Sequence, residues 1–311
     1  MTDAPAAGSR LGYLGPAGTF TEQALRVLHP DAVDPWPAPT VAAAADAVRA
    51  GELEAVVVPF ENSVEGAVPA TLDELVRGEP LMITAEAHVR VQFALLARQE
   101  MPLDRVQRLA SHPHALAQVR RWVARHLPEV EVVPESSTAQ AAARVAEGAY
   151  DVAVAAPTAA RTHGLVVLAD RIGDAEAAVT RFVRLARPGP PPPPTGADTT
   201  TLVAFIRQNR PGALLEILEQ FAVRGVDLTR LESRPTGQGL GQYCFTIDAV
   251  GHVAEPRVAE ALSGLHRTCR QVRFLGSYPR ADGVIQPVAP EAGEQAWGEA
   301  RDWVRRLVTG G

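Results

Sequence analysis

The first two thirds of the chain alternate short apolar runs with segments whose apolar residues recur at helical spacing. Runs such as Ala55–Phe60 have the length and the continuous apolar character of strands that are buried on both faces. In Thr40–Ala50 apolar residues recur at every third or fourth position, which predicts a helix that Gly51 ends. This alternation predicts an α/β fold with largely parallel sheets.

The individual elements expected in this part follow from the same pattern. The predicted strands are Leu11–Gly15, Ala55–Phe60, Val91–Ala97, Val130–Pro134, Asp151–Ala155 and Val179–Leu185. The predicted helices are Thr21–Leu28, Thr40–Ala50, Pro69–Val76, His114–Arg125, Ala139–Glu147 and Ala159–His163. Either Ser137 or Thr138 is expected to cap the helix that starts at Ala139.

The pattern changes after a proline-rich segment, PGPPPPPTGAD (Pro188–Asp198), which is expected to be a semi-rigid extended spacer. The elements that follow have the order β-α-β-β-α-β, which predicts a ferredoxin-like domain. They are Thr200–Arg207, Gly212–Arg224, Asp227–Ser233, Gln242–Ala249, Pro256–His266 and Val272–Ser277. We therefore expect a first domain at 10–187, a linker at 188–198, a second domain at 199–280 and a tail at 281–311. The tail segment Gln295–Val308 is expected to form an amphipathic helix that docks on the domain.

The composition excludes several classes of function. The chain has 311 residues, 46% of them hydrophobic, and a net charge of −6, so it lacks the basic footprint of a nucleic-acid-binding protein. Its two cysteines, Cys244 and Cys269, have neither a disulfide-framework spacing nor a metal-ligand spacing, and are expected to be buried. The N-terminus has no apolar signal core and the apolar runs are too short to span a bilayer, so we expect a cytoplasmic protein with no membrane partner.

Five segments of the first domain, in their joint order and spacing, resemble the signature stretches of prephenate dehydratases. They are GYLGPAGTFTEQAL (Gly12–Leu25), VVPFENSVEGAVPATLDEL (Val57–Leu75), SHPHALAQ (Ser111–Gln118), STAQAA (Ser137–Ala142) and VTRFVRL (Val179–Leu185). The second domain is similar to the ACT domain that usually follows, through PGALLEIL (Pro211–Leu218) and ESRP (Glu232–Pro235).

This resemblance implies a two-lobed, periplasmic-binding-protein-like (type II) catalytic domain, with the active site between the lobes, and a ferredoxin-like ACT domain. It implies the conversion of prephenate to phenylpyruvate, carbon dioxide and water in phenylalanine biosynthesis, without a metal or organic cofactor. It also implies feedback regulation by L-phenylalanine at the ACT domain, and assembly as a homodimer or homotetramer. The enzyme has to position a dianion and assist the departure of hydroxide.

The resemblance ties Thr180 to catalysis, and we expect its hydroxyl to donate a hydrogen bond to the leaving hydroxyl. An alternating strand places Thr180 and Phe182 on one face and Arg181 on the other. Arg181 is suited equally to clamping a substrate carboxylate and to pairing with an acidic neighbour such as Asp174. Phe182 is expected to form a packing wall beside the reacting groups.

Glu61, Asn62 and Ser63 follow a predicted strand, where α/β proteins place their ligands. Asn62 and Ser63 are short donors that suit carboxylate or carbonyl oxygens. The charge of Glu61 would repel a dianion unless the group is protonated, or neutralised by a helix N-terminus or an arginine. We therefore expect Asn62 and Ser63 to bind the substrate and Glu61 to orient them.

The remaining residues expected at the substrate are Thr19, Phe20, Thr21, Ser111, His112, Gln118 and Thr138. The threonines are also suited to capping their own helices, and a cap can stand beside a bound carboxylate. His112 and His114 flank Pro113 and suit a structural role better than that of a general acid. The family usually has glutamine where His114 stands and asparagine where Ala178 stands, so the fine geometry of this site is expected to differ.

The residues expected to bind phenylalanine are Asn209, Pro211, Gly212, Ala213, Leu214, Leu215, Glu232, Ser233, Arg234 and Pro235. The turn before Leu214 opens a helix whose N–H groups suit an amino-acid carboxylate. Leu214 and Leu215 either border an aromatic pocket or belong to the core, and Glu232–Pro235 are suited to entering from a second subunit. The segment GQGLGQ (Gly237–Gln242) lies between strands, which predicts a hairpin turn and not a dinucleotide loop.

Three other functions are compatible with parts of the sequence. Arogenate dehydratase carries out the same chemistry on an aminated side chain, and the sequence does not separate the two. A non-catalytic amino-acid-binding module is disfavoured by the intact Thr180, Arg181, Asn62 and Ser63, although Ala178 departs from the pattern. An ACT-containing transcriptional regulator would need a basic helix or DNA-binding segment, and none is recognisable.

Overall fold

The computed structural model describes residues 10–175, 178–237 and 243–310. Contacts divide the chain into two units, Met1–Thr71 with Ala87–Val183, and Leu72–Glu86 with Arg184–Gly311. The domain boundaries expected from the sequence stay a prediction.

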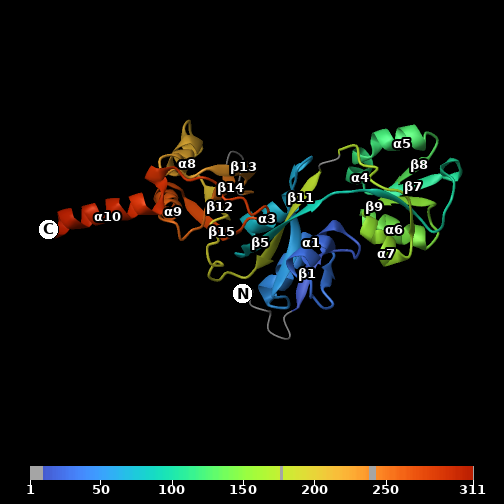
Figure 1. Cartoon of the computed structure of the whole chain (residues 1–311), viewed down its shortest axis with the longest axis horizontal. Coiled ribbons are helices and arrows are strands. Elements are labelled where there is room, and N and C mark those ends of the chain that lie inside the picture. The colour runs from blue at the N-terminus through green and yellow to red at the C-terminus, as the bar shows by residue number, and fades with distance from the viewer. Residues whose placement is uncertain (1–9, 176–177, 238–242, 311) are drawn as a thin grey trace. The chain divides into compact units, whose positions relative to one another are not determined.

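A six-stranded sheet forms the first lobe (Figure 1). Its strands are β1 (Leu11–Leu14), β2 (Trp36–Ala38), β3 (Ala55–Asn62), β4 (Gly66–Ala67), β5 (Met82–Arg90) and β11 (Val179–Ala186). They follow the order β2-β1-β3-β11-β5, with β4 paired to the end of β3. Strand β1 is parallel to β2 and β3, and β4 is antiparallel to β3. The helices of this lobe are α1 (Phe20–Leu28), α2 (Val41–Ala50) and α3 (Pro69–Arg77).

A five-stranded sheet with the order β10-β6-β9-β7-β8 forms the second lobe. Its strands are β6 (Ala94–Ala97), β7 (Arg108–Ser111), β8 (Glu131–Pro134), β9 (Val152–Ala155) and β10 (Val166–Ala169). Its helices are α4 (Pro113–Gln118), α5 (Arg120–His126), α6 (Thr138–Ala146), α7 (Pro157–His163) and the 3-10 turn η1 (Leu103–Arg105). Alternate residues of one strand enter two different core clusters, Leu95 in one and Leu96 in the other, so the sheet is buried on both faces.

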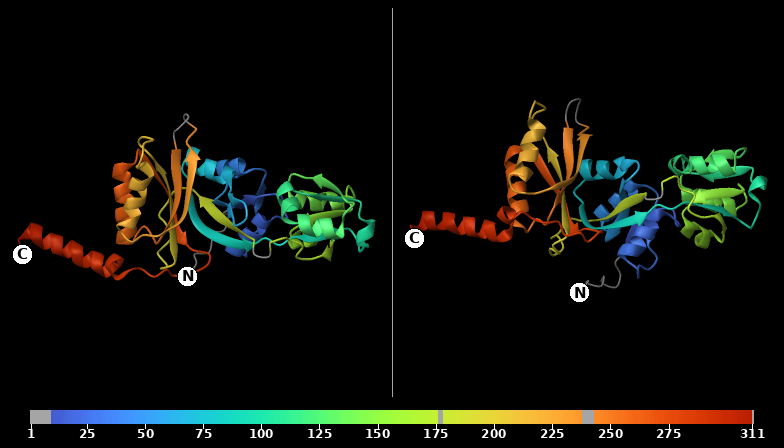
Figure 2. Two further views of the ribbon diagram at one scale, coloured as in Figure 1. Left: turned by 90° about the horizontal axis from the view of Figure 1, so that it is seen from above. Right: turned by 45° about the horizontal axis from the view of Figure 1, so that its top comes forward.

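The second unit contains the elements β12 (Asp198–Phe205), α8 (Ala213–Ala222), β13 (Leu228–Pro235), β14 (Tyr243–Val250), α9 (Pro256–Thr268) and β15 (Gln271–Pro279). The strands form an antiparallel sheet with the order β13-β14-β12-β15. Helices α8 and α9 lie on one face of that sheet (Figure 2) and bury Ile217, Phe221 and Leu265 against it. The ferredoxin-like expectation is confirmed.

The two expected signals of helix ends, the stop at Gly51 and a cap before α6, are both present, and Thr40, expected as the first helical residue, is the cap of α2. The hydroxyl of Thr40 accepts a hydrogen bond from the Ala43 N–H at 3.1 Å at the start of α2. Gly51 ends that helix with φ of 80°, a left-handed conformation that glycine adopts at low cost. Of the two candidate caps for α6, Ser137 has this role, because its hydroxyl accepts from the Gln140 N–H at 2.9 Å.

The α/β expectation is confirmed, but the sheets are mixed and not largely parallel. Strand β6 follows β5 with no helix between them, and it runs antiparallel to both β9 and β10. The single helix expected over His114–Arg125 is two helices, α4 and α5, which meet at Val119 with φ of −120°. The strands β2, β4, β5 and β10 were not expected from the sequence.

Strand β5 is hidden in the sequence because it buries a charged residue. Glu86 is 8% exposed, and its carboxylate accepts a hydrogen bond from the Ala281 N–H at 2.9 Å. A buried carboxylate is tolerated only where such a donor satisfies it. The donor lies far along the chain, so the local pattern gives no sign of it. Next to Glu86, the Thr84 hydroxyl accepts from Arg184 Nε at 2.7 Å.

The tail is helical as expected, but only its first part is covered: Trp297 is half-buried, with its Nε1 buried, whereas the later apolar residues are exposed. After the short turn η2 (Pro290–Ala292), helix α10 (Glu294–Thr309) contains no buried residue. Its apolar residues Trp303, Val304 and Leu307 are all at least half exposed, at 56%, 50% and 63%. The expected docking on the domain is therefore wrong for these residues.

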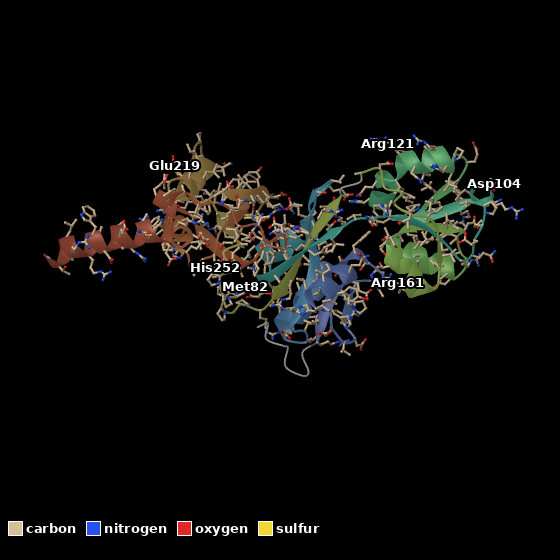
Figure 3. All side chains as sticks on the ribbon, viewed as in Figure 1. Met82, Asp104, Arg121, Arg161, Glu219 and His252 are labelled. Atoms are coloured by element: carbon tan, nitrogen blue, oxygen red, sulfur yellow. The ribbon has the colours of Figure 1, made fainter. Side chains whose placement is uncertain are left out.

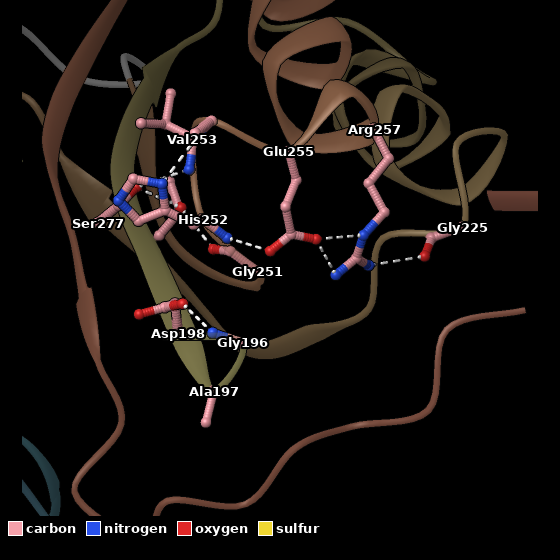
Figure 4. Close-up of polar contacts among 12 residues, drawn as sticks. Gly196, Ala197, Asp198, Gly225, Gly251, His252, Val253, Glu255, Arg257 and Ser277 are labelled. Carbon is pink, nitrogen blue, oxygen red and sulfur yellow. Dashed lines mark hydrogen bonds and ion pairs between the residues drawn. The ribbon is translucent and has the colours of Figure 1, made fainter. Parts of the chain in front are cut away.

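The proline-rich segment is held at both ends by side chains of the second unit. Near its start, the Gly189 N–H donates to the sulfur of Met82 at 3.3 Å (Figure 3). In its middle, the buried His252 bonds the carbonyl of Pro192 through Nε2 at 2.9 Å. At its end, Asp198 accepts from the Gly196 N–H at 2.9 Å, and nearby Glu255 accepts from the N–H of His252 (Figure 4). These bonds fix the spacer against β12 and α9.

Both cysteines are free and buried, as expected. Burial raises the pKa of the Cys244 and Cys269 thiols, so neither side chain has the character of a reactive thiolate. Among the described residues, no helix is long and apolar enough to cross a membrane.

We predict that Gly276→Ala destabilises the second unit strongly. Gly276 has φ of 136°, and a Cβ there would overlap the carbonyl oxygen of Ile83. Backbone strain and overpacking together are expected to cost about 3 kcal/mol. Thermal unfolding of the full chain measures this loss. Gly283→Ala is the matched control, because Gly283 also has positive φ, at 62°, but has open space around it. Equal melting temperatures for the two variants would contradict the steric argument.

Candidate active site

The ends of β3 and β11 bring Asn62 and Thr180 together. The side-chain amide of Asn62 donates from Nδ2 to the hydroxyl oxygen of Thr180 at 2.8 Å. The other end of that amide accepts from the N–H groups of Val64 and Glu65, at 2.8 and 3.2 Å. Two backbone donors at Oδ1 fix the orientation of the amide, so the NH₂ group must face Thr180. Thr180 is 8% exposed and accepts this bond, which leaves its own hydrogen to be donated elsewhere.

Ser63 joins the same two strand ends through the backbone. Its N–H donates to the carbonyl of Val179 at 2.9 Å, and its hydroxyl accepts from the N–H of Val179 at 3.0 Å. These bonds fix the residue just before Thr180. The hydroxyl of Ser63 is therefore engaged with the chain as well as adjacent to the Asn62–Thr180 pair.

The acidic neighbour of Arg181 is Glu61, and Asp174 is engaged elsewhere. The guanidinium lies 3.8 Å from the Glu61 carboxylate and 4.9 Å from the centre of the Phe60 ring. Asp174 instead accepts from the N–H of Arg121 at 3.0 Å. The Arg181 side chain is only 13% exposed, so its charge offsets that of Glu61 in a partly dry environment. Phe182 is buried, as the alternation of the strand predicts.

Glu65 is also part of the site, although it was not among the residues expected there. Its carboxylate accepts from Nε2 of Gln118 at 2.8 Å and bonds Nδ1 of His114. Both partners lie on α4 of the second lobe, whereas Glu65 lies between β3 and β4 of the first. A carboxylate three residues beyond Asn62 was the available signal, but its partners are separated from it by 49 and 53 residues.

Ser111 and His112 are held by the second lobe itself. The fully buried Ser111 donates from its hydroxyl to the carbonyl of Val154 at 2.6 Å. Nδ1 of His112 accepts from the N–H of His114 at 3.3 Å and caps α4. Burial, and then the nearby His114, lower the pKa of His112 from its ordinary 6.5, while Glu65 opposes this.

The N-terminus of α1 is occupied by its own side chains. Thr19 caps the helix by accepting from the Glu22 N–H at 3.4 Å, and Glu22 accepts from the N–H of Gly18, the residue before the cap, at 2.7 Å. Phe20 packs edge-on against Phe93 at 5.7 Å, and Thr21 is buried. Thr19 also lines a cavity of about 310 Å³ between α1 and α7.

Thr138 is the first residue of α6, one position after the Ser137 cap. The structure therefore brings together Glu61, Asn62, Ser63, Thr180 and Arg181, and adds Gln118 through Glu65. The bonds of Thr19 and Ser111 stay within their own helix or lobe, whereas Phe20 packs against Phe93, which belongs to the core of the second lobe.

The second unit contains a cavity of about 580 Å³ between α8, β13 and β14. Six residues expected at the phenylalanine site line it: Asn209, Gly212, Ala213, Leu214, Leu215 and Ser233. Ile206, Arg210, Leu218, Tyr243 and Phe245 also line it and were not selected. Tyr243 and Phe245 share one face of β14, which is the periodic signal that could have identified them.

The other expected residues of this site face elsewhere. Arg234 donates to the carboxylate of Asp73 in α3 at 2.6 Å. Glu232 lies 3.5 Å from the guanidinium of Arg230. Neither these two residues nor Pro211 and Pro235 line the described cavity. The turn expected at Gly237–Gln242 lies almost wholly outside the described residues.

Gly212 begins α8 with φ of 85°, and no side chain caps this helix. Gly212, Ala213 and Leu214 at this end of the helix line the cavity, whose other walls are mainly apolar side chains. Arg210 lies at the same end and pairs with Glu216 at 2.6 Å.

We predict that His112 titrates below 6.5. A lowered histidine pKa means that the unfolded chain binds the proton more tightly than the folded one. Its contribution to stability is therefore complete above pH 6.5 and is lost as the pH falls through the lower, folded pKa. NMR titration of labelled imidazoles measures the midpoint. His112→Asn keeps a capping acceptor that does not titrate, so its unfolding free energy should change less between pH 7 and pH 5. A midpoint at or above 6.5 in the folded protein would be inconsistent with this.

Comparison with known proteins agrees with this geometry. A family model described as prephenate dehydratase matches residues 11–190, and one described as ACT domain matches residues 200–267. A curated protein from Amycolatopsis methanolica, named prephenate dehydratase, is 50% identical over 303 residues, which cover 97% of this chain and 99% of the relative.

Solved structures extend the likeness to the fold. The structure of prephenate dehydratase in complex with L-Phe from Arthrobacter aurescens has a TM-score of 0.91 and 49% identity, and the match covers 96% of this chain and 99% of that one. A structure described as GqqA, a quorum-quenching acylase, has a TM-score of 0.78 and 34% identity over 86% of this chain and 97% of its own. The family match over more than half of the chain, together with half-identity to a relative over nearly its whole length, establishes that this chain belongs to the prephenate dehydratase family.

Proposed function

We propose that this protein is a lyase that converts prephenate to phenylpyruvate, with loss of carbon dioxide and water, in the synthesis of L-phenylalanine. The observation that carries this proposal is the bond from Asn62 to Thr180, at 2.8 Å. Because the Thr180 oxygen accepts that bond, its own hydrogen is available to the hydroxyl that leaves the substrate. Relatives named prephenate dehydratase support the same reaction.

The reaction is driven by formation of an aromatic ring, so the protein's task is placement and electrostatics. The ring hydroxyl leaves as the carboxylate on the same ring is lost as carbon dioxide. A hydrogen-bond donor at the departing oxygen stabilises the charge that develops there. A threonine is a poor acid in water, but a donor fixed by Asn62 and Ser63 needs no reorganisation when the charge appears.

The charges around this pair suit a dianion. Arg181 offsets Glu61, so the end of β3 is not a net repulsive centre for carboxylates. We assign Arg181 an electrostatic role beside Thr180, and Glu61 the role of holding Arg181. Asn62 and Ser63 offer short polar groups at the same edge, and the buried Phe182 follows Thr180 on the same face of β11.

The other residues expected at the substrate are proposed to shape the pocket around this centre. Gln118 contacts the Asn62 turn through its bond to Glu65. We propose that Thr19, Phe20, Thr21, Ser111, His112 and Thr138 contribute mainly by holding the helices and strands that border the substrate. The capping and backbone bonds of Thr19, Ser111 and His112 support that role.

We propose that L-phenylalanine binds the cavity beside α8 and lowers activity. An uncapped helix N-terminus suits an amino-acid carboxylate, and the apolar walls suit an aromatic side chain. Leu215 and Tyr243 at this cavity are 58% and 40% exposed, which suits coverage by a second subunit in a homodimer or homotetramer. Glu232, Arg234, Pro211 and Pro235 are then proposed to support the site from behind or from the partner. We place the enzyme in the cytoplasm, where a biosynthetic enzyme meets its substrate.

The acylase named among the related structures suggests a second activity, which the site favours less. An acylase needs a nucleophile that a base activates. The side-chain partner of Thr180 is the NH₂ group of Asn62, and an amide nitrogen that donates cannot also take the hydroxyl proton.

We predict that the purified protein forms phenylpyruvate from prephenate and that added L-phenylalanine lowers this rate. Absorbance of phenylpyruvate measures the rate, and equilibrium dialysis measures phenylalanine binding. If phenylalanine binds and the rate does not change, the catalytic proposal stands and the proposed feedback inhibition is contradicted. No turnover on prephenate or arogenate would contradict the catalytic proposal. Turnover on arogenate but not on prephenate would make arogenate the substrate in place of prephenate.

We predict that Thr180→Val lowers kcat by about 100-fold or more, the loss typical of one donor removed from a developing charge. Thr180→Ser keeps the hydroxyl and is expected to stay within about 10-fold. Thr229→Val, which removes an exposed hydroxyl in β13, serves as the control. Unchanged kcat in Thr180→Val would rule out the donor role.

The variant Asn62→Asp tests whether the direction of the Asn62–Thr180 hydrogen bond matters for the donor role of Thr180. An aspartate can still accept from the Val64 and Glu65 N–H groups, but it draws the hydrogen of Thr180 towards itself. We expect kcat at saturating prephenate to fall about as far as in Thr180→Val, with the fold retained by circular dichroism.

A further inference from the structure

The strongest unassigned feature of the catalytic unit is the carboxylate of Glu65, which joins the two lobes. It lies on the turn between β3 and β4 of the first lobe. Its two partners, Gln118 and His114, are four residues apart on α4 of the second lobe and therefore share one face of that helix. The side chains of Glu65 and His114 are 35% and 64% exposed, so water reaches both bonds and weakens them.

The turn that carries Glu65 is built on the catalytic asparagine. Oδ1 of Asn62 accepts from the Glu65 N–H at 3.2 Å, while Nδ2 of the same amide donates to Thr180. The Ser63 N–H is fixed to Val179 at 2.9 Å on the neighbouring strand. A displacement of Glu65 would therefore shift the ends of β3 and β11, which hold the Thr180 hydroxyl.

The helix on the other side is equally constrained. Pro113 occupies the first turn of α4, and His112 caps it. The N–H of Leu116 donates to the carbonyl of His112 at 3.0 Å, and Ser111 anchors the preceding strand to Val154. His114 and Gln118 thus present their donors from a rigid frame.

Other contacts join the lobes without touching this turn. Gln23 of α1 donates to the hydroxyl of Thr158 in α7 at 2.7 Å, and Phe20 packs on Phe93. Those contacts hold the lobes on the side of α1. Glu65 differs because it links the second lobe directly to Asn62 and Thr180.

We propose that Glu65 is a positioning residue that latches the second lobe over the Asn62–Thr180 pair. This inference rests on the proposed function and adds a regulator of lobe closure at the same site. The latch favours the closed arrangement before substrate binds, so prephenate spends less of its binding free energy on closure. His114 serves as one of the two donors, which gives a role to a residue that departs from the family pattern.

The test compares Glu65→Ala, Glu65→Gln and the wild-type chain in steady-state kinetics. Loss of the latch should raise KM for prephenate about 10-fold and leave kcat within about 3-fold, because saturating substrate still closes the lobes. Glu65→Gln keeps an acceptor for Gln118 and is expected to recover most of the loss. Glu129→Ala removes an exposed carboxylate from the same unit and is the matched control for charge.

A double-mutant cycle with His114→Ala asks whether the two side chains act together. If the latch exists, Glu65→Ala/His114→Ala should raise KM hardly more than Glu65→Ala alone. His114→Gln restores the usual family residue and should bind close to wild type. Independent, multiplying effects of the two alanine changes would overturn the proposal.

A second readout does not depend on turnover. Cysteines introduced at the exposed Val33 and Asp104, one in each lobe, accept spin labels, while Cys244 and Cys269 are buried. Double electron–electron resonance without substrate should show a narrow distance distribution in the wild type and a broader, longer one in Glu65→Ala. An unchanged distribution with unchanged KM would overturn the latch. Absent turnover in the wild type, with a distribution that Glu65→Ala broadens, would overturn the proposed function and keep the latch.

Discussion

The first unit depends on the two-ended use of one amide group. Asn62 accepts two backbone N–H groups at its oxygen and donates to Thr180 from its nitrogen. The two halves support each other, because the backbone donors at Oδ1 orient the amide, and the oriented amide then holds the Thr180 hydroxyl. The turn therefore orients the Asn62 amide, and the amide orients the hydroxyl hydrogen of Thr180. A hydrogen oriented in this way can be donated to a departing hydroxide.

The placement of charge follows from the same strand ends. On β11 the alternation of side chains keeps Thr180 and Phe182 inside and turns Arg181 to the other face, where it meets Glu61 and the ring of Phe60. A carboxylate so close to the site would repel a dianion in a partly dry environment. With Arg181 beside it, the pair supplies a dipole and not a net negative charge, so the polar edge can accept carboxylates.

What the sequence could predict is what depends on near neighbours. The caps Thr40 and Ser137, the stop at Gly51 and the β-α-β-β-α-β order are local signals, and the structure contains them. Strand β5 was not predicted, because Glu86 is satisfied by the distant Ala281 N–H. Glu65 was not selected, because its partners belong to the other lobe. The bond from Arg234 to Asp73 is likewise invisible to a local pattern, because the two residues lie 161 positions apart. The neighbours Asn62 and Thr180 were found through resemblance, but only the structure gives the direction of the bond between them.

The separation of Ser233 from Arg234 bears on how an effector can act. Adjacent residues of a strand face opposite ways, so Ser233 lines the cavity while Arg234 reaches Asp73 of α3. The same helix is held at its other end by the carbonyls of Leu75 and Gly78, which accept from Arg273 of β15. A ligand beside Ser233 can alter activity only if it binds one arrangement of β13 better than another. Arg234 and Asp73 thus join β13, which borders the cavity, to α3, whose first turn follows in the chain the segment that carries Asn62 and Glu65.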